Sequence, residues 1–237
     1  MTQARVPLDR QQALTKPEIA IEEIDRVIAS GARFGCVLAD AGAVYPERLQ
    51  GSRRSSSGPF RRALSERGLL SAVGLSRRQN VYPADVGLIF LIAKTSRRRQ
   101  YQMPDRPPVS TEAMLAGQRW GKVSWRRGTK GRLTCLFAAR RVRIAEGHKH
   151  RMLDDRMQCM PGGEVWLVGE RRSTGEQKYD VSNLPADATL KTLAAAIKAR
   201  WICQQAHQQL KEELGLDHFE GRSWPFDRAQ EDYTDMP

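Results

Sequence analysis

The stretch that decides the fold is Phe34-Gly-Cys-Val-Leu-Ala-Asp40, an unbroken apolar run closed by an aspartate. Continuous apolarity, rather than alternation, is typical of a strand that is buried on both faces, as in an α/β sheet. In such sheets the functional groups collect at the carboxyl ends of the strands. The run therefore predicts a buried strand over 34–39 and marks Asp40 as a candidate functional residue.

A helix precedes this strand, and a helix and a second strand follow it. Thr15-Lys-Pro-Glu18 matches a capping box with proline in the first turn, and helical spacing of apolar residues continues to Ser30-Gly31. After the strand, a short helix over 60–67 leads to a second apolar run, Leu69–Leu75. Between the two strands, Tyr45–Gly58 is basic, serine-rich and aperiodic, which predicts a loop or a disordered insert.

The sequence from Arg77 to Leu184 predicts a mostly β segment. Prolines interrupt any long helix there, and RGTKG at 127–131 is typical of a hairpin turn. Short β-prone runs lie at Val86–Ala93, Lys122–Arg126, Leu133–Ile144, Glu164–Gly169 and Lys178–Val181. Beyond this segment, Asp187 is predicted to cap a long helix, Ala188–Leu214, which Gly215 ends.

Composition restricts the class of protein. The 237 residues are 40% hydrophobic, too apolar for a disordered chain and too polar for a membrane protein. Lysine and arginine number 39 against 27 aspartates and glutamates, and the net charge of +12 favours an anionic partner, nucleic acid before acidic lipid. No apolar run spans a bilayer, the first residues lack signal-peptide character, and the four cysteines form no CxxC pair. These features predict a protein of the reducing cytoplasm.

The long predicted helix carries a polar stripe. Arg200, Gln204, His207 and Lys211 fall within an arc roughly 60° wide at helical spacing. Two cations, an imidazole and an amide on one face could grip a phosphate and a metal-bound substrate, although a solvated helix face has the same pattern.

The sequence around this stripe closely resembles the third catalytic block of bacterial insertion-sequence transposases of the DDE type. In that group a helix carries Y-x2-R-x3-E-x6-K, often followed by GLDHxExR. Here Arg200, Gln204 and Lys211 keep the helix spacing, and GLDHFEGR follows at 215–222.

Two further stretches extend the resemblance to roughly residues 11–42 and 58–224. Val181-Ser-Asn-Leu-Pro185 resembles the strand end before that helix, and Val37-Leu-Ala-Asp-Ala-Gly42 resembles the second catalytic block. The resemblance implies an α/β fold, a partial ribonuclease-H-like fold interrupted by a mostly β insertion. We expect an N-terminal tail (1–12), a first part of the DDE domain (13–76, with a disrupted loop 43–58), the β-rich insertion (77–184), a C-terminal helix block (185–224) and a disordered tail (225–237).

The resemblance also implies a chemistry and partners. Two divalent ions, Mg²⁺ or Mn²⁺, would be held by two aspartates and a glutamate, one activating a water or 3′-hydroxyl and the other stabilising the leaving oxygen. Asp40 corresponds to the second catalytic, metal-binding aspartate, and Gln204 takes the position of the catalytic glutamate. Arg200 and Lys211 are expected to hold DNA phosphates. The implied partners are insertion-sequence DNA ends and either a second copy or an intact transposase, with no membrane.

Departures from the family pattern predict an inactive copy. Gln204 offers only a neutral amide oxygen, which cannot offset the charge of a dication. The family's first aspartate lies on a strand well before the first helix, where this sequence has only Asp9, so we expect that aspartate and the opening strands to be missing. A Tyr-Gly pair expected soon after Asp40 is replaced by Ala43-Val-Tyr-Pro46, and the residues after Trp224 turn polar and acidic. Such breaks suggest frame changes in a decaying element.

A basic stretch provides a second candidate DNA contact. Residues 119–143 contain no acidic side chain, and Trp120 and Trp125 are interleaved with the cations Arg119, Lys122, Arg126, Arg127, Lys130, Arg132, Arg140, Arg141 and Arg143. Cations contact phosphates and aromatic rings stack on unpaired bases. The alternative is a solvated hairpin whose tryptophans pack inward.

Three hypotheses remain from the sequence. The first is a transposase-like protein for DNA binding and phosphodiester strand cleavage and transfer, in a catalytically inactive copy. The second is a non-catalytic, basic DNA-binding remnant that interferes with an intact transposase, and the third is an unstable remnant without a role. Metal-dependent cleavage would favour the first, and salt-sensitive DNA binding without cleavage the second.

Overall fold

The computed structural model of the chain describes residues 14–40, 57–92, 100–128, 131–151 and 157–214. The predicted tails and almost all of the serine-rich stretch lie outside these ranges. The helices are α1 (Lys16–Ala29), α3 (Ser57–Glu66), α4 (Thr111–Ala116) and α5 (Leu190–Leu214). The strands are β1 (Val37–Ala39), β2 (Ser71–Leu75), β3 (Asn80–Pro83), β4 (Leu88–Ile92), β5 (Gln100–Pro104), β6 (Val109–Ser110), β7 (Gly121–Gly128), β8 (Gly131–Arg151), β9 (Met157–Arg171) and β10 (Gln177–Ser182).

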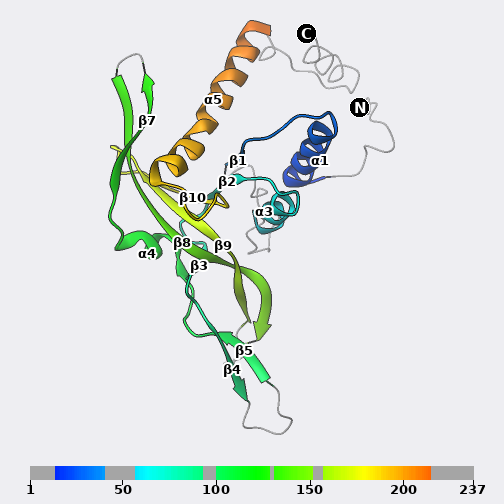
Figure 1. Cartoon of the computed structure of the whole chain (residues 1–237), viewed down its shortest axis with the longest axis vertical. Helices are drawn as coiled ribbons and strands as arrows, with labels where there is room; N and C mark the ends of the chain where they lie inside the picture. The colour runs from blue at the N-terminus through cyan, green and yellow to red at the C-terminus, as the bar shows by residue number, and fades with distance from the viewer. Residues whose placement is uncertain (1–13, 41–56, 93–99, 129–130, 152–156, 215–237) are drawn as a thin grey trace, which may run out of the picture.

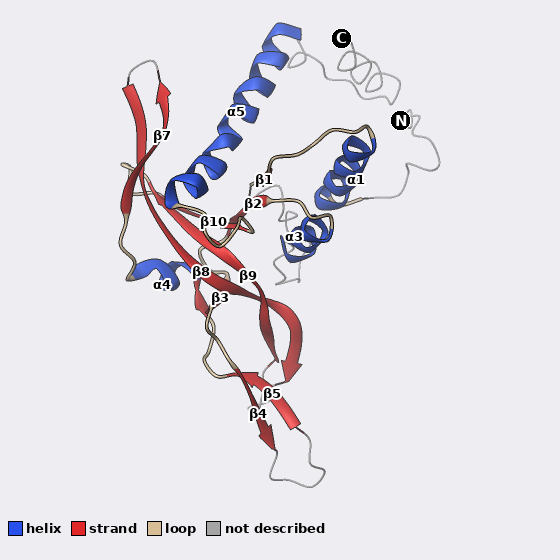
Figure 2. Ribbon diagram, in the orientation of Figure 1, coloured by secondary structure: helices blue, strands red, loops and turns tan. Residues whose placement is uncertain are grey.

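One mixed sheet organises the described part of the chain (Figure 1, Figure 2). Its strands follow the order β1-β2-β10-β9-β8-β3-β6, and β7 also pairs with β8. β1 and β2 run parallel, whereas the other neighbours are antiparallel. β4 and β5 form a separate two-stranded ribbon. This mixed architecture, with a mostly β segment between β2 and α5, confirms the predicted α/β, ribonuclease-H-like fold class.

Capping residues define both ends of α1, which lies where the sequence predicts a helix. The Glu18 carboxylate accepts the backbone N–H of Thr15 at 2.7 Å, the bond by which the glutamate of a capping box holds the cap residue, and it also accepts the Thr15 hydroxyl at 2.7 Å. These bonds lower the pKa of Glu18. At the other end, Gly31 takes a φ of 87°, a left-handed conformation that glycine adopts without steric cost.

The predicted starts of β1 and α5 are wrong. The strand expected over 34–39 begins only at Val37, because its partner β2 begins at Ser71 and leaves the earlier residues without a ladder. Phe34 is accordingly 37% exposed. Asp187 does not cap α5, since it lies in a turn closed by the Ala188 N–H and the Pro185 carbonyl. Thr189 is the cap instead, and its hydroxyl accepts the Thr192 N–H at 3.1 Å.

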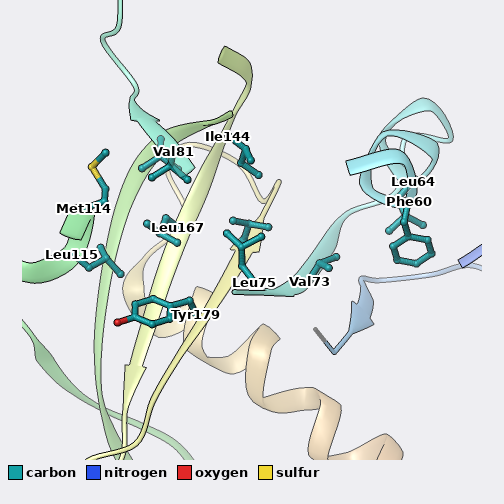
Figure 3. Close-up of a cluster of buried hydrophobic side chains, with 12 residues drawn as sticks. Phe60, Leu64, Val73, Leu75, Val81, Met114, Leu115, Ile144, Leu167 and Tyr179 are labelled. Atoms are coloured by element: carbon teal, nitrogen blue, oxygen red, sulfur yellow. The ribbon is translucent and has the colours of Figure 1, made fainter. Parts of the chain in front are cut away.

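The sheet has a hydrophobic core on each face. Neighbouring residues of a strand point to opposite faces, so Val73 belongs to one core and Ala72 to the other. The first core, under α3 and α4, includes Phe60, Leu64, Val73, Leu75, Val81, Met114, Leu115, Ile144, Leu167 and Tyr179 (Figure 3). The second core, under α5, includes Ala72, Val123, Phe137, Val168, Leu184, Leu193, Ala194 and Ile197.

The two halves of α5 have different surroundings. Leu193, Ala194 and Ile197 in its first turns are buried against the sheet. Every residue from 201 to 210 is exposed, and in Figure 1 this half of the helix points away from the strands. At the end of the sheet beside α5, β1 pairs only with β2 within the described ranges. No described helix is long and apolar enough to cross a membrane.

We expect the docking of α5 to depend on its first half alone. Leu193→Ala should lower the free energy of unfolding by about 2–5 kcal/mol, because it leaves a cavity at a side chain that is 1% exposed. Leu210→Ala is the matched control on the same helix, 49% exposed, and should change it by less than about 0.5 kcal/mol. Urea denaturation followed by circular dichroism measures both. Equal losses would show that the outer half is packed as well.

Candidate functional site

The structure brings Asp40 and Arg200 together from positions 160 residues apart. Asp40 directly follows β1, at its carboxyl end, and Arg200 lies on α5 where the helix leaves the sheet. The Nη1 atom of Arg200 is 3.2 Å from Oδ1 of Asp40 and 3.5 Å from the Ala39 carbonyl oxygen. The two residues that the transposase resemblance selected independently therefore form one ion pair.

A cavity of about 280 Å³ lies between α5 and the sheet beside this pair. The lining from α5 consists of Ile197, Lys198, Arg200, Trp201 and Gln204. The lining from the strands and their connections consists of Trp125, Leu133, Glu170, Arg172, Lys178 and Asp180. Arg200 and Gln204 of the predicted stripe thus face this cavity, whereas His207 is exposed further along the helix and Lys211 is partly exposed.

Glu170 near the end of β9 is buried and paired with two cations. The side chain is 4% exposed and accepts hydrogen bonds from Lys198 and, at 3.1 Å, from Nε of Arg172. Burial alone would raise its pKa, but the two cations outweigh burial and lower the pKa instead. Lys198 also lies 4.7 Å from the centre of the Trp125 ring. Glu170 is therefore an anion that Lys198 and Arg172 already neutralise.

Asp180 on β10 is buried without such partners. The residue is 6% exposed, yet none of the hydrogen bonds or ion pairs between described residues involves its carboxylate. Burial raises the pKa of Asp180 to about 6, although Arg200 opposes the shift and the charges of Glu170 and Asp40 add to it. Such a carboxyl, in a cavity and half-ionised at about pH 6, is typical of functional sites.

No pattern in the sequence selects Asp180 or Glu170. In Lys178-Tyr-Asp-Val-Ser182, polar and apolar residues alternate, which predicts a strand with its polar face in water. That face is instead covered by α5, and only the register of β10 against its neighbours reveals this. Asp180 lies opposite Gly74 of β2 in the strand register. Because glycine has no side chain, no β2 side chain lies there between Asp180 and the end of β1, the next strand.

The basic stretch meets α5 at the rim of the cavity. Arg119, Lys122 and Arg126 are exposed, and the Arg126 guanidinium lies 4.4 Å from the centre of the Trp201 ring. The side chain of Arg127 and all of Lys130 lie outside the described part of the chain. The strands β7 and β8 pair antiparallel as the predicted hairpin. The two candidate DNA contacts, on the hairpin and on α5, are thus neighbours.

The tryptophans of the basic stretch pack within the protein. Trp125 contacts Phe137 edge to face, with ring centres 6.1 Å apart. Trp120 carries the Arg171 guanidinium 4.3 Å from its ring centre. The alternative interpretation, in which these rings pack inward, is correct for both residues, so their stacking on bases finds no support. Contact of the surrounding cations with DNA stays a prediction.

The predicted metal ligands do not fit a pair of divalent ions. Within the described ranges, no three His, Cys, Asp or Glu side chains lie close enough to hold a metal ion. Asp40 faces the Arg200 guanidinium, and Gln204 supplies only an amide. Two dications side by side need several anionic ligands to offset their repulsion. The described donors therefore supply no metal chemistry.

We expect Asp180 to make stability depend on pH. A folded pKa of about 6 exceeds the value of 3.8 for an ordinary aspartate, so the folded state gains stability as pH falls from about 7 to 4. Asp180→Asn removes the buried charge and should raise the free energy of unfolding at pH 7.5 by about 2–3 kcal/mol, because each pKa unit corresponds to about 1.4 kcal/mol. At pH 4 the gain should vanish.

Denaturant titrations at pH 4.0, 5.0, 6.0 and 7.5 measure this dependence. Asp187→Asn is the matched control, since Asp187 is an exposed aspartate on the loop between β10 and α5. It should behave like the parent chain at each pH. A constant difference between Asp180→Asn and the parent chain across this range would contradict the assignment.

The comparison with protein families agrees with this geometry. A family model described as DDE superfamily endonuclease matches residues 1–132, more than half of the chain. The match includes β1 and Asp40 and ends at the start of β8, so Arg200 and Gln204 lie beyond it. A search of curated proteins finds no match. Nucleases of this superfamily act on DNA and generally use divalent metal ions. On the extent of the family match, the chain belongs to the DDE superfamily of endonucleases.

Proposed function

We propose that this chain is a transposase-like DDE protein of an insertion sequence that binds DNA and does not cleave it. The observation that carries the proposal is the ion pair between Arg200 and Asp40 beside Gln204, at the predicted catalytic position. A nuclease of this superfamily would present a glutamate there as a metal ligand. This chain presents the amide of Gln204 instead, and its Asp40 is paired with Arg200.

The charges around the cavity support the absence of cleavage. Asp40 is held by Arg200, and Glu170 is held by Lys198 and Arg172. Burial penalises the charged form of Asp180. A divalent ion would have to displace these cations and would meet only one acidic ligand at a family position. We infer that Mg²⁺ does not bind productively at this position.

The exposed cations support DNA binding. Arg119, Lys122 and Arg126 lie on β7 or just before it, and Arg126 reaches α5 through Trp201. Arg200 and Lys211 are on the same helix. Cations from the hairpin and the helix can therefore contact one phosphate backbone, which binds without sequence preference. The net charge of +12 acts in the same direction at longer range.

We expect duplex DNA binding that weakens steeply with salt. Replacing Arg119, Lys122 and Arg126 together with glutamine should reduce the slope of log affinity against log salt by roughly 2–3, since each phosphate contact contributes about 0.9. Lys16, Arg33 and Arg78, which are exposed but lie outside this surface, provide the matched triple control. Fluorescence anisotropy of a labelled duplex at several salt concentrations measures the slope. An equal loss in both triple variants would place the phosphate contacts elsewhere.

We also expect no Mg²⁺-dependent nicking or strand transfer. Gln204→Glu alone should not restore activity, because Asp40 would be the only other carboxylate at a family position within the described residues, too few to hold two divalent ions. Supercoiled plasmid and labelled duplex, incubated with Mg²⁺ or Mn²⁺, provide the measurement, and Asp40→Ala gives the background. Cleavage above that background by the parent chain would sink the proposal, even if DNA binding were as expected.

A further inference from the structure

The cavity under α5 contains a buried carboxyl group that the proposed function does not use. Asp180 is more than nine-tenths buried, lines the cavity and makes no hydrogen bond or ion pair with the described part of the chain. Burying an unpaired carboxylate is costly, and the cost disappears if the group carries a proton or meets a ligand. The position of Asp180 therefore suggests a ligand that accepts a hydrogen bond.

The charges that face Asp180 indicate the sign of that ligand. They come from β9 and the residue after it, from β10, from α5 and from the end of β1: Glu170, Arg172, Lys178, Lys198, Arg200 and Asp40. β2 contributes only Gly74 beside Asp180. The lining of the cavity itself contains four cations and two carboxylates. A cation is disfavoured in such surroundings, and an anion is favoured.

Two of the cations are loosely held and can reach an anion. Lys178 lies 3.6 Å from Glu176, and Arg200 lies 3.2 Å from Asp40. Both of these acidic partners are about half exposed, so water weakens the two pairs. Lys198 and Arg172, in contrast, are fixed on the buried Glu170. Lys178 and Arg200 can therefore turn to a ligand without leaving a buried charge unpaired.

We propose that this cavity binds a phosphate group, with Asp180 in its acid form donating a hydrogen bond to a phosphate oxygen while Lys178 and Arg200 supply the positive charge. One proton is taken up from water by the Asp180 carboxylate for each phosphate bound, and no covalent bond changes. Phosphate diesters of DNA and inorganic phosphate share this chemistry. The first source rests on the proposed function, whereas the second does not.

Proton uptake makes binding depend on pH. The buried Asp180 has a pKa of about 6, so protonation is within reach near neutral pH. A ligand that binds only the acid form should bind roughly 25-fold more tightly at pH 5.5 than at pH 7.5. A phosphate diester keeps its charge over this range, which makes DNA the cleaner probe. Asp180→Asn should bind DNA with the tighter affinity at both pH values.

The experiment uses the full chain and two probes, a 20-base-pair duplex and inorganic phosphate, at pH 5.5 and 7.5. The variants are Asp180→Asn, Lys178→Gln and the exposed control Asp187→Asn. Calorimetry measures binding, and the fluorescence of Trp125 and Trp201 reports occupation of the cavity. Lys178→Gln should lower the affinity for both probes and keep the difference in affinity between the two pH values. Asp187→Asn should match the parent chain.

The outcomes separate this inference from the proposed function. If DNA affinity changes between pH 5.5 and pH 7.5 in the parent chain and not in Asp180→Asn, the result supports both the phosphate site and the proposed function. DNA binding with the same pH dependence in the parent chain and Asp180→Asn overturns the phosphate site and leaves the proposed function intact. An Asp180-dependent step with inorganic phosphate but no binding of duplex supports the phosphate site and overturns DNA as the partner.

Discussion

The pairing of β2 with β10 is the constraint on which the rest of the structure depends. It joins residues more than 100 positions apart, from Tyr179 opposite Leu75 to Ser182 opposite Ala72. Side chains lock its end, because Asn183 accepts the Ser71 N–H at 2.6 Å and Ser182 donates to the Ser71 carbonyl at 2.8 Å. All five residues of β2 are buried. The pairing extends the parallel β1–β2 pair into the long antiparallel strands and sets Asp180 beside Gly74.

The same pairing explains why the carboxylates of the site pair with cationic side chains and form no metal-binding cluster. It positions the carboxyl end of β1, the buried face of β10 and the departing part of α5 around one cavity. Three carboxyl groups reach this region, but each meets a different environment: Asp40 pairs with an arginine at the surface, Glu170 with two cations in the interior, and Asp180 with none. Carboxylates that lie close together do not form a metal site when lysine and arginine side chains lie between them.

The sequence predicted the elements whose signals are local. The capping box of α1, the hairpin signal at 127–131 and the apolar run of β2 each act over a few residues. α1 and the pairing of β7 with β8 appear where expected, and β2 lies within the predicted run Leu69–Leu75. β3, β5, β6 and α4 were not predicted, because elements of two to six residues leave little periodicity. Asp40 and Arg200 came from motif spacing, and the structure joins them. The role of Asp180 depends on which face of β10 a distant helix covers, and this information is absent from the local pattern.

The contrast between the two halves of α5 has a consequence for hydrogen exchange. Amides of the first turns are protected by the packed core and open only with the whole sheet. Beyond Trp201 the described residues form no packed core against the helix, and an isolated helical segment of this length is marginal in water. Protection should therefore fall along the helix toward Leu214, and local fraying should set the exchange rates there. A ligand held by the outer half would have to order that segment, and the entropy of ordering would be subtracted from its affinity.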